Sequence, residues 1–172
     1  KLNWRNINDG KIYIDEQTRK NAISLRNNML RLAETYVNEK NFEKAEEILD
    51  LSLEKMPIKD FGHYSIALGY PEMYYRIGKV EKARQTAETL ISILQQKLQW
   101  YSTFDSKFDN VIYGETQNTI LMYQSGILNY IEQYDDDQEY VKKLQGEFIN
   151  YLRLFSRFLP PETQPVSIPI KE

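Results

Sequence analysis

The strongest constraint on this chain is a stretch of helical sequence that occurs twice at a fixed distance. The segment YVNEKNFEKAEEILDLS begins at Tyr36, and the matching segment YYRIGKVEKARQTAETL begins at Tyr74. The triplet EKA recurs inside them, so that Ala83 follows Ala45 by the same 38 residues that separate the two tyrosines. Two anchors at one spacing indicate an internal repeat, and a period near this length is typical of stacked helical hairpins.

The first copy has the periodicity of two amphipathic helices. Asp15 is a typical N-cap residue, and apolar residues recur at helical spacing from about Glu16 to Asn38. After a break that contains Asn41, a second helix is predicted from Phe42 to Lys55. Pro57 ends this helix, because proline disfavours helical geometry in the residue before it.

This pair of helices matches the tetratricopeptide pattern when the unit is numbered from Arg26. Small residues allow the two helix backbones to approach, and large residues fill the gaps beside them. The small positions are Ala33, Ala45 and Ser52, the bulky positions are Met29, Leu32, Tyr36 and Leu49, and the terminal proline is Pro57.

The later part of the chain keeps helical periodicity with less regular anchors. Pro71 falls inside the first helix of the second copy, so we expect a break near Leu68–Tyr70 and a short helix from Pro71. Its partner helix is predicted from Val80 to about Thr103, followed by a loop, STFDSKFDNVIYGE. A third pair is predicted over about 116–134 and 137–158, with the aspartates of DDD capping the last helix.

The predicted fold is therefore all-α, with about six helices in two and a half to three tetratricopeptide-like hairpins that form an α–α superhelix. We expect the repeat domain at 16–159, with pairs at about 16–57, 64–103 and 116–159. An irregular lead-in at 1–15 precedes it, and a proline-rich tail at 160–172 follows it.

Composition narrows the classes of partner. A net charge of −3 and a pI near 5.4 argue against nucleic acid, because phosphate binding needs a basic stripe. The longest apolar runs are far shorter than the roughly 20 residues that span a bilayer, and KLNWRNINDG lacks the apolar centre of a signal peptide. The chain begins with Lys1 and not with Met, so we expect a piece of a longer polypeptide.

The inventory of reactive residues predicts no enzyme activity for this region. The sequence holds no cysteine and one histidine, His63, which excludes thiol catalysis, a Cys–His pair and the usual zinc sites. It holds no P-loop, dinucleotide-binding or nucleophile-elbow motif. Asp135–Asp137 and Glu139 lack the alternating spacing of a calcium loop. We therefore expect no cofactor and no metal, and a structural or surface role for His63.

One candidate binding feature follows from geometry. In stacked hairpins the first helix of each repeat lines a concave surface, which suits a polar peptide or a glycan-like ligand when tyrosine, amide and carboxylate groups share it. The candidate groove residues are Asn27, Arg31, Glu34, Glu72, Tyr75, Arg76, Tyr123, Tyr130 and Gln133, with Leu30, Val37, Ser65 and Leu68 at the remaining positions. The Lys–Asn pattern of a carboxylate-clamp groove is absent. The alternative is that the Leu, Val and Tyr residues belong to the core between the helices.

Several motifs, taken in order, resemble a known membrane-protein family. They are NW at Asn3–Trp4, IYIDE at Ile12–Glu16 and LRNNMLRLAE at Leu25–Glu34, followed by EKAEEILD and YYRIGKVEKA. Their order over about residues 3 to 103 resembles the soluble C-terminal region of the multi-pass, protein O-mannosyltransferase-like proteins of Gram-negative bacteria, a domain-of-unknown-function family. The resemblance implies a membrane glycosyltransferase that uses a lipid-linked sugar donor, with this region on the periplasmic side. No catalytic residue is carried over, because no position here matches the family's catalytic region.

The expected function is a non-catalytic interaction module that positions an acceptor protein or packs on the membrane domain of the same chain. A free-standing cytoplasmic scaffold of the same fold is one alternative, which a full-length gene without upstream membrane helices would favour. A glycan-binding module is another. Exposed tryptophan and tyrosine platforms in one cleft would favour it, and Trp4 and Trp100 are the candidates for such platforms.

Overall fold

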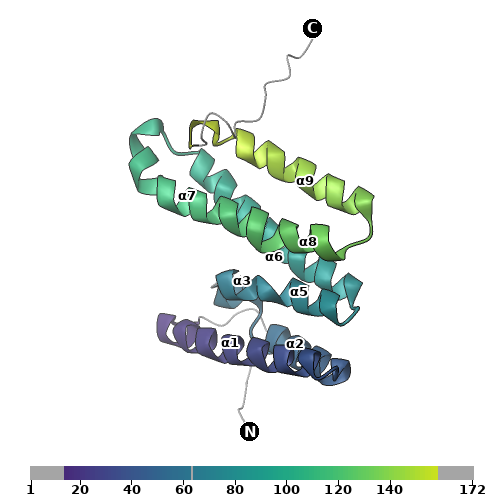
Figure 1. Cartoon of the computed structure of the whole chain (residues 1–172). Helices are drawn as coiled ribbons and strands as arrows, with labels where there is room; N and C mark the ends of the chain where they lie inside the picture. Colours follow the sequence, from purple (N-terminus) through teal and green to yellow (C-terminus); the bar gives the residue numbers. More distant parts are fainter. Residues whose placement is uncertain (1–13, 63, 159–172) are drawn as a thin grey trace. The chain divides into compact units, whose positions relative to one another are not determined.

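The computed structural model of the chain describes residues 14–62 and 64–158, and all regular elements in these ranges are helical (Figure 1). The all-α prediction is confirmed for this part of the chain. The chain divides into two compact units, Lys1–Leu90 and Ile91–Glu172. Helix α6 (Val80–Ser102) contributes residues to both. The predicted lead-in at 1–15 and the tail at 160–172 lie almost wholly outside the described residues.

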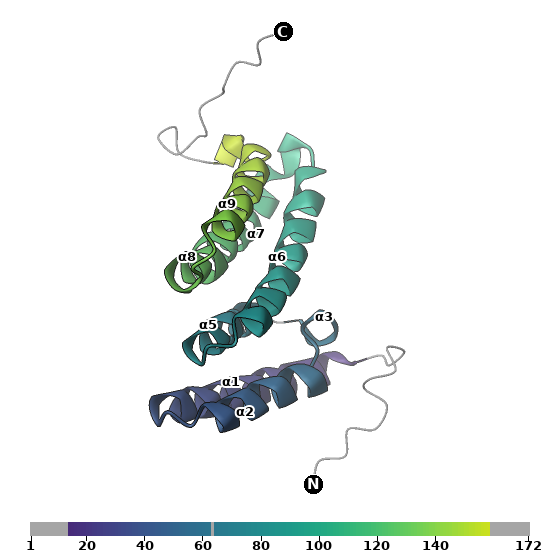
Figure 2. The same cartoon turned by 90° about the vertical axis from the view of Figure 1, so that its right-hand side faces the viewer.

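The first unit opens with the predicted pair of helices. Helices α1 (Glu16–Asn38) and α2 (Phe42–Lys55) have the bounds that the sequence indicates, and they lie side by side in both views (Figures 1 and 2). Asp15 caps α1, since its carboxylate accepts hydrogen bonds from the backbone N–H and the hydroxyl of Thr18 at 3.0 and 2.6 Å. Ala33 and Ala45 are fully buried, so they provide the close approach of the two backbones.

The turn that ends α1 is repeated 38 residues later at the end of α5 (Gly69–Arg76). In the first turn the N–H of Asn41 donates to the carbonyl of Tyr36 at 2.8 Å, and in the second the N–H of Lys79 donates to Tyr74 at 2.8 Å. The residue at the left-handed position is Lys40 in the first, with φ of 59°, and Gly78 in the second, with φ of 74°. Both turns are Schellman caps, so the repeat seen in the sequence extends to backbone hydrogen bonds.

Two short helices fill the connection between the copies. Helix α3 (Ile58–Phe61) follows Pro57, and α4 (Tyr64–Ala67) precedes a turn at Leu68. The break expected before Pro71 is present, but α5 begins at Gly69, two residues earlier than expected. Proline is tolerated there because the first turn of a helix leaves its N–H groups without partners inside the helix.

The second unit contains the end of α6, helix α7 (Asp109–Tyr123), helix α8 (Asn129–Tyr134) and helix α9 (Gln138–Arg153). The prediction of a loop up to residue 115 is wrong, since α7 begins at Asp109 after a short 3₁₀ turn. The reason is that Ile112, Thr116 and Ile120 recur at helical spacing and are all buried. Gly114 lies on the exposed side, where a glycine costs about 1 kcal/mol without ending a helix.

A π-helical turn, Gln124–Leu128, separates α7 from α8. The N–H of Asn129 donates to the carbonyl of Gln124, five residues back, which is the bond that defines this turn. Helix α9 ends at Arg153 and is followed by a 3₁₀ turn at Ser156–Phe158, so the last predicted helix is shorter than 137–158.

Aromatic side chains pack with aliphatic ones in the second unit's core. The ring of Tyr123 meets that of Phe148 edge to face at 4.9 Å, and Phe155 stacks on Phe158 at 6.0 Å. The predicted cap of α9 is confirmed, because Asp137 accepts hydrogen bonds from the backbone N–H groups of residues 139 and 140, both at 3.1 Å. The aspartate run therefore serves the helix end, as the helix dipole favours.

Candidate interaction surface

Within the first unit, the first helices of the two sequence copies are neighbours. Helix α1 packs against α5, and Leu30 lies where a side chain on Gly69 would be. A Cβ at Gly69 would come within 2.8 Å of the Leu30 side chain, so glycine permits the approach. We call the outer face of these helices the α1–α5 surface. Its residues are Asn27, Arg31, Glu34, Asn38, Glu72 and Arg76.

Arg76 connects the two helices of the α1–α5 surface. Its Nη2 donates to Oδ1 of Asn38 at 2.9 Å, and its Nη1 lies 3.9 Å from Oε1 of Glu72. Arg76 and Glu72 are half-buried, so their positions are fixed by neighbours. In contrast, Arg31 and Glu34 are exposed, as is Asn27. The α1–α5 surface therefore presents one exposed positive and one exposed negative side chain, beside the guanidinium of Arg76, whose position is fixed by Asn38 and Glu72.

The tyrosines of the predicted groove are placed differently from the polar residues. Tyr75 is 7% exposed and Tyr123 is fully buried, so the expectation that they line an open surface is corrected by their burial. The hydroxyl of Tyr123 accepts a hydrogen bond from Nε2 of Gln95 at 2.9 Å. Large aromatic rings at these positions fill space between helices, which is the core role that the sequence left open.

The remaining candidates follow the π-helical turn of the second unit. Tyr130 is half-buried and Gln133 is exposed. One extra residue in a helical turn rotates all later side chains by about 100° relative to an uninterrupted α-helix. The register that would place Tyr130 and Gln133 in phase with Tyr123 is therefore interrupted between residues 124 and 128.

The other predicted groove positions are those of Leu30, Val37, Ser65 and Leu68. Val37 is buried at 7% exposure, Leu30 and Leu68 are half-buried, and Ser65 is exposed. The apolar members of this group thus belong to the packing of the first unit. Its polar member alone faces solvent.

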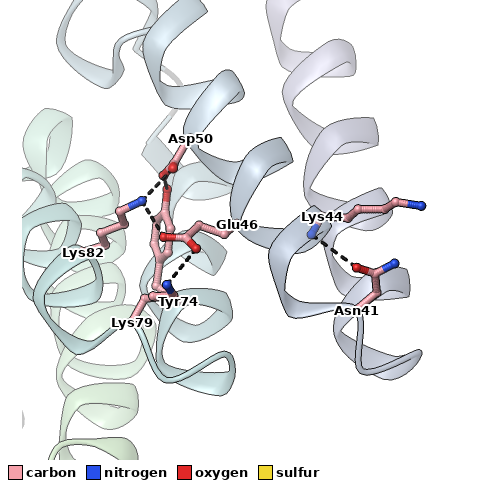
Figure 3. Close-up of polar contacts among 7 residues, drawn as sticks. All are labelled: Asn41, Lys44, Glu46, Asp50, Tyr74, Lys79 and Lys82. Atoms are coloured by element: carbon pink, nitrogen blue, oxygen red, sulfur yellow. Dashed lines mark hydrogen bonds and ion pairs between the residues drawn. The ribbon is translucent and has the colours of Figure 1, made fainter.

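A charged network joins α2 to the second copy (Figure 3). Nζ of Lys82 lies 2.7 Å from Oε1 of Glu46 and 2.6 Å from Oδ2 of Asp50, and Nζ of Lys79 lies 2.8 Å from the other oxygen of Glu46. Below them the buried hydroxyl of Tyr74 donates to Oδ1 of Asp50 at 2.8 Å. Two carboxylates, two ammonium groups and a phenol therefore satisfy one another.

The pKa shifts in this network move Glu46, Lys82 and Tyr74 away from neutral pH, where a general acid or base would have to titrate. Hydrogen bonds from Lys79 and Lys82 lower the pKa of Glu46, and hydrogen bonds to Asp50 and Glu46 raise the pKa of Lys82. Burial, with donation to Asp50, raises the pKa of Tyr74. These pKa directions favour an ionised Glu46, a charged Lys82 and a neutral Tyr74 at neutral pH. The network holds α2 against the helices of the second copy. In the sequence, Glu46 and Asp50 are four residues apart and Lys79 and Lys82 are three apart, and this spacing is the signal that could have predicted a charged cluster.

A buried guanidinium was missed as well. Arg26 is 2% exposed, and its two Nη groups donate to the carbonyl oxygens of Met56 and Gly62, the latter at 3.0 Å. Its Nε finds no hydrogen-bond partner among the described residues. Burial lowers the pKa of the guanidinium, although an arginine stays charged at neutral pH. Arg26 therefore ties α1 to the connection that follows α2.

An exposed aromatic cluster ends α6 in the second unit. Trp100 is 59% exposed, and Phe104 meets its ring edge to face at 4.9 Å. Phe108, which is 41% exposed, meets Phe104 at 5.8 Å. The other tryptophan, Trp4, and the lone histidine, His63, lie outside the described residues, so their predicted roles stay predictions.

Among the described residues, 14–62 and 64–158, which include no histidine and no cysteine, no three carboxylates are gathered in a way that could hold a metal ion. None of their helices combines the length and the apolar composition that a membrane crossing requires.

Comparisons with protein-family models, with curated proteins and with solved structures give no match to this chain. A function for it therefore rests on the residues and the geometry described above.

Proposed function

We propose that this chain is a non-catalytic interaction module of tetratricopeptide-like hairpins, and that its α1–α5 surface binds a segment of another protein. The single observation that carries the proposal is the packing of α1 on α5, with Arg76 reaching Asn38 across the two helices at 2.9 Å. The repeated Schellman turns support the tetratricopeptide-like arrangement. A preformed surface of this kind binds without large ordering costs.

The chemistry of the surface favours a polar peptide with charges of both signs. Arg31 and Glu34 are exposed on one helix, and the amide of Asn27 can both donate and accept hydrogen bonds. Arg76 and Glu72 already form an ion pair with each other. They therefore contribute to the shape of the α1–α5 surface more than to its affinity for a peptide. Exposed charges of this type guide the approach of a partner and set its orientation more than they set affinity.

A site-specific photocrosslinking experiment tests this surface. A photoreactive phenylalanine analogue placed at Asn27, in the natural full-length protein in its own cells, should give adducts with one or a few defined proteins. The matched control carries the analogue at Glu47, which is also exposed, on α2. Substitution of Arg31→Glu should reduce the Asn27 adducts at least severalfold. Equal adducts at both positions, or none at Asn27, would reject the α1–α5 surface.

We also propose that the intact protein is membrane-attached and glycosyltransferase-like, with this module on the periplasmic side, where it positions an acceptor protein or packs on the membrane domain. The support is the ordered set of motifs that resembles that family. Peptide and intact-mass analysis of the native protein tests it. Several apolar spans upstream of Lys1 are expected, and a start codon close to Lys1 would leave a free-standing soluble scaffold instead.

A glycan-binding module is the second candidate, favoured by the exposed ring of Trp100 with Phe104 behind it. A flat, supported aromatic ring can stack on the apolar face of a sugar. A glycan array probed with the chain, and with a Trp100→Ala variant, tests this. Binding that is lost in the variant would support the second candidate, and an array without signal would remove it.

A further inference from the structure

The second unit holds a cavity of about 500 Å³ between two of its helical segments. The π-helical turn and α8 form one wall, and α9 forms the other. Cavities of this size accommodate small molecules or a few residues of a peptide. The cavity lies outside the α1–α5 surface, and no part of the proposed function uses it.

The floor of the cavity is apolar and fixed. Leu128 is 7% exposed and Phe148 is 5% exposed, and the Phe148 ring is held edge to face by Tyr123 at 4.9 Å. Beside the floor, Ile149 is 41% exposed on α9. An aliphatic side chain that enters here would lie on this floor and cover the exposed part of Ile149, and removal of apolar surface from water favours binding.

The rim of the cavity is polar and carries negative charge. Gln124, Asn129 and Gln145 place amide groups around it, and an amide can pair with both the N–H and the C=O of a peptide backbone. Among the lining residues that the structure describes, Glu132 alone is ionisable. Its side chain is exposed, so a cation can reach it from solvent.

The π-helical turn shapes the polar wall. Its bond from Asn129 to the carbonyl of Gln124 encloses one more residue than an α-helical bond does, which widens the helix beside the cavity. Such turns recur at functional sites because they redirect side chains and loosen the backbone pattern. The turn therefore gives a second, independent reason to assign a binding role here.

We propose that this cavity binds a short peptide segment in which an aliphatic residue stands next to a lysine or arginine. The aliphatic side chain lies on Leu128 and Phe148, the cation pairs with Glu132, and the rim amides bond to the peptide backbone. The site is independent of the α1–α5 surface, so either proposal can fail without the other.

A titration with defined dipeptides tests the site. The probe is N-acetyl-Leu-Lys-amide, added to the full 20.5 kDa chain and followed through backbone N–H chemical shifts. Saturable shifts are expected in residues 124–132 and 145–152. N-acetyl-Leu-Gln-amide should bind about two- to fivefold more weakly, because an exposed ion pair contributes little. N-acetyl-Ser-Lys-amide should give no saturable shift.

Two variants separate the charge from the apolar contact. Glu132→Gln should abolish the preference for the lysine probe over the glutamine probe while leaving the affinity for the glutamine probe unchanged. Ile149→Ser should weaken both leucine probes severalfold. The matched control is Leu154→Ser, at a residue 45% exposed and outside the cavity, which should change neither affinity.

Three results would overturn the inference. The first is equal affinity of the wild-type chain for the lysine and glutamine probes. The second is an Ile149→Ser effect no larger than that of Leu154→Ser. The third is the absence of saturable shifts around the cavity, including the case in which the shifts appear on α1 and α5 instead. That last pattern would support the α1–α5 surface and reject the cavity.

Discussion

The two units of this chain are both helical, but only the first repeats itself in detail. Its two Schellman turns match bond for bond at a spacing of 38 residues, and buried alanines stand at equivalent positions, Ala45 and Ala83. The second unit joins α8 to α9 through Asp135, whose backbone is extended, and through the cap at Asp137. A repeated backbone turn therefore leaves matching residues in the sequence, whereas the second unit, which has no such repeated turn, leaves few.

The substitution with the largest expected effect removes the buried guanidinium of the first unit. Arg26→Ala should lower the free energy of unfolding by about 3 kcal/mol, because a buried carbonyl group and a part-buried one lose a charged donor. Urea denaturation measures the loss. Hydrogen exchange of peptides from each unit shows whether the second unit opens with the first.

The control for this substitution is Arg31→Ala, on the exposed side of the same helix. It should change stability by no more than about 0.5 kcal/mol. If Arg26→Ala cost less than about 1 kcal/mol, the guanidinium would not hold the connection after α2.

A pair of tyrosine substitutions compares hydrogen bonds of the two units. Tyr74→Phe should cost about 1.5 kcal/mol, because its hydroxyl donates to the carboxylate of Asp50. Tyr123→Phe should cost about half as much, because its partner is the neutral amide of Gln95. Urea denaturation at pH 7 ranks the two. The reverse order would mean that Lys82 already satisfies Asp50 when the phenol is absent.

Alkaline pH should weaken both units through these tyrosines. Burial raises the pKa of Tyr123 to about 12, whereas an unfolded tyrosine loses its proton near pH 10. The folded state therefore favours the neutral phenol, and this stability is fully present below pH 10 and is lost as pH rises toward 12. Near pH 11 the loss from Tyr123 is about 1 kcal/mol per pH unit.

Unfolding in urea from pH 8 to 11.5 tests the alkaline loss. Tyr123→Phe should flatten the decline above pH 10 and leave the curve parallel to wild type below pH 9. Parallel curves throughout would show that the Tyr123 phenol titrates in the folded chain as it does in the unfolded one.

The smallest expected effects come from exchanging the two turn residues. Lys40→Gly should stabilise the chain by about 0.5–1 kcal/mol, because a lysine at φ of 59° is strained where glycine is not. Gly78→Lys should destabilise it by a similar amount. No atom lies within 4 Å of a Cβ built on Gly78, so the backbone alone sets the cost. Thermal melts of the two variants measure both shifts, and shifts of the same sign would contradict the equivalence of the turns.

The sequence predicted the first unit well for a physical reason. The cap at Asp15, the break at Asn41 and the stop at Pro57 are local signals, and they bound α1 and α2 at the residues found. The 38-residue spacing exceeds the period of about 34 that is usual for the proposed tetratricopeptide-like hairpins by four residues, which is the length of α3. The apolar ends of α3, Ile58 and Phe61, are buried, so the added turn joins the core.

The features that the sequence did not predict depend on contacts between distant residues. Burial of Arg26 requires the carbonyl groups of Met56 and Gly62, which lie 30 and 36 residues away. In the structure the polar residues of the candidate groove are exposed or half-buried. Tyr75 and Tyr123 are instead buried in the core. A helical wheel assumes one register, and the π-helical turn breaks that assumption in the second unit.

That turn also has a consequence for how the chain could change in length. A helix that carries one surplus residue can lose it without losing the helix, so deletion of a single residue between 124 and 128 would let α7 and α8 join as one α-helix. The same deletion would remove the widened turn from the wall of the 500 Å³ cavity, while the side chains of α8 would keep their orientation relative to α7. A one-residue gap at this place in a related sequence would thus be a sign that the chain has kept its fold and given up the cavity.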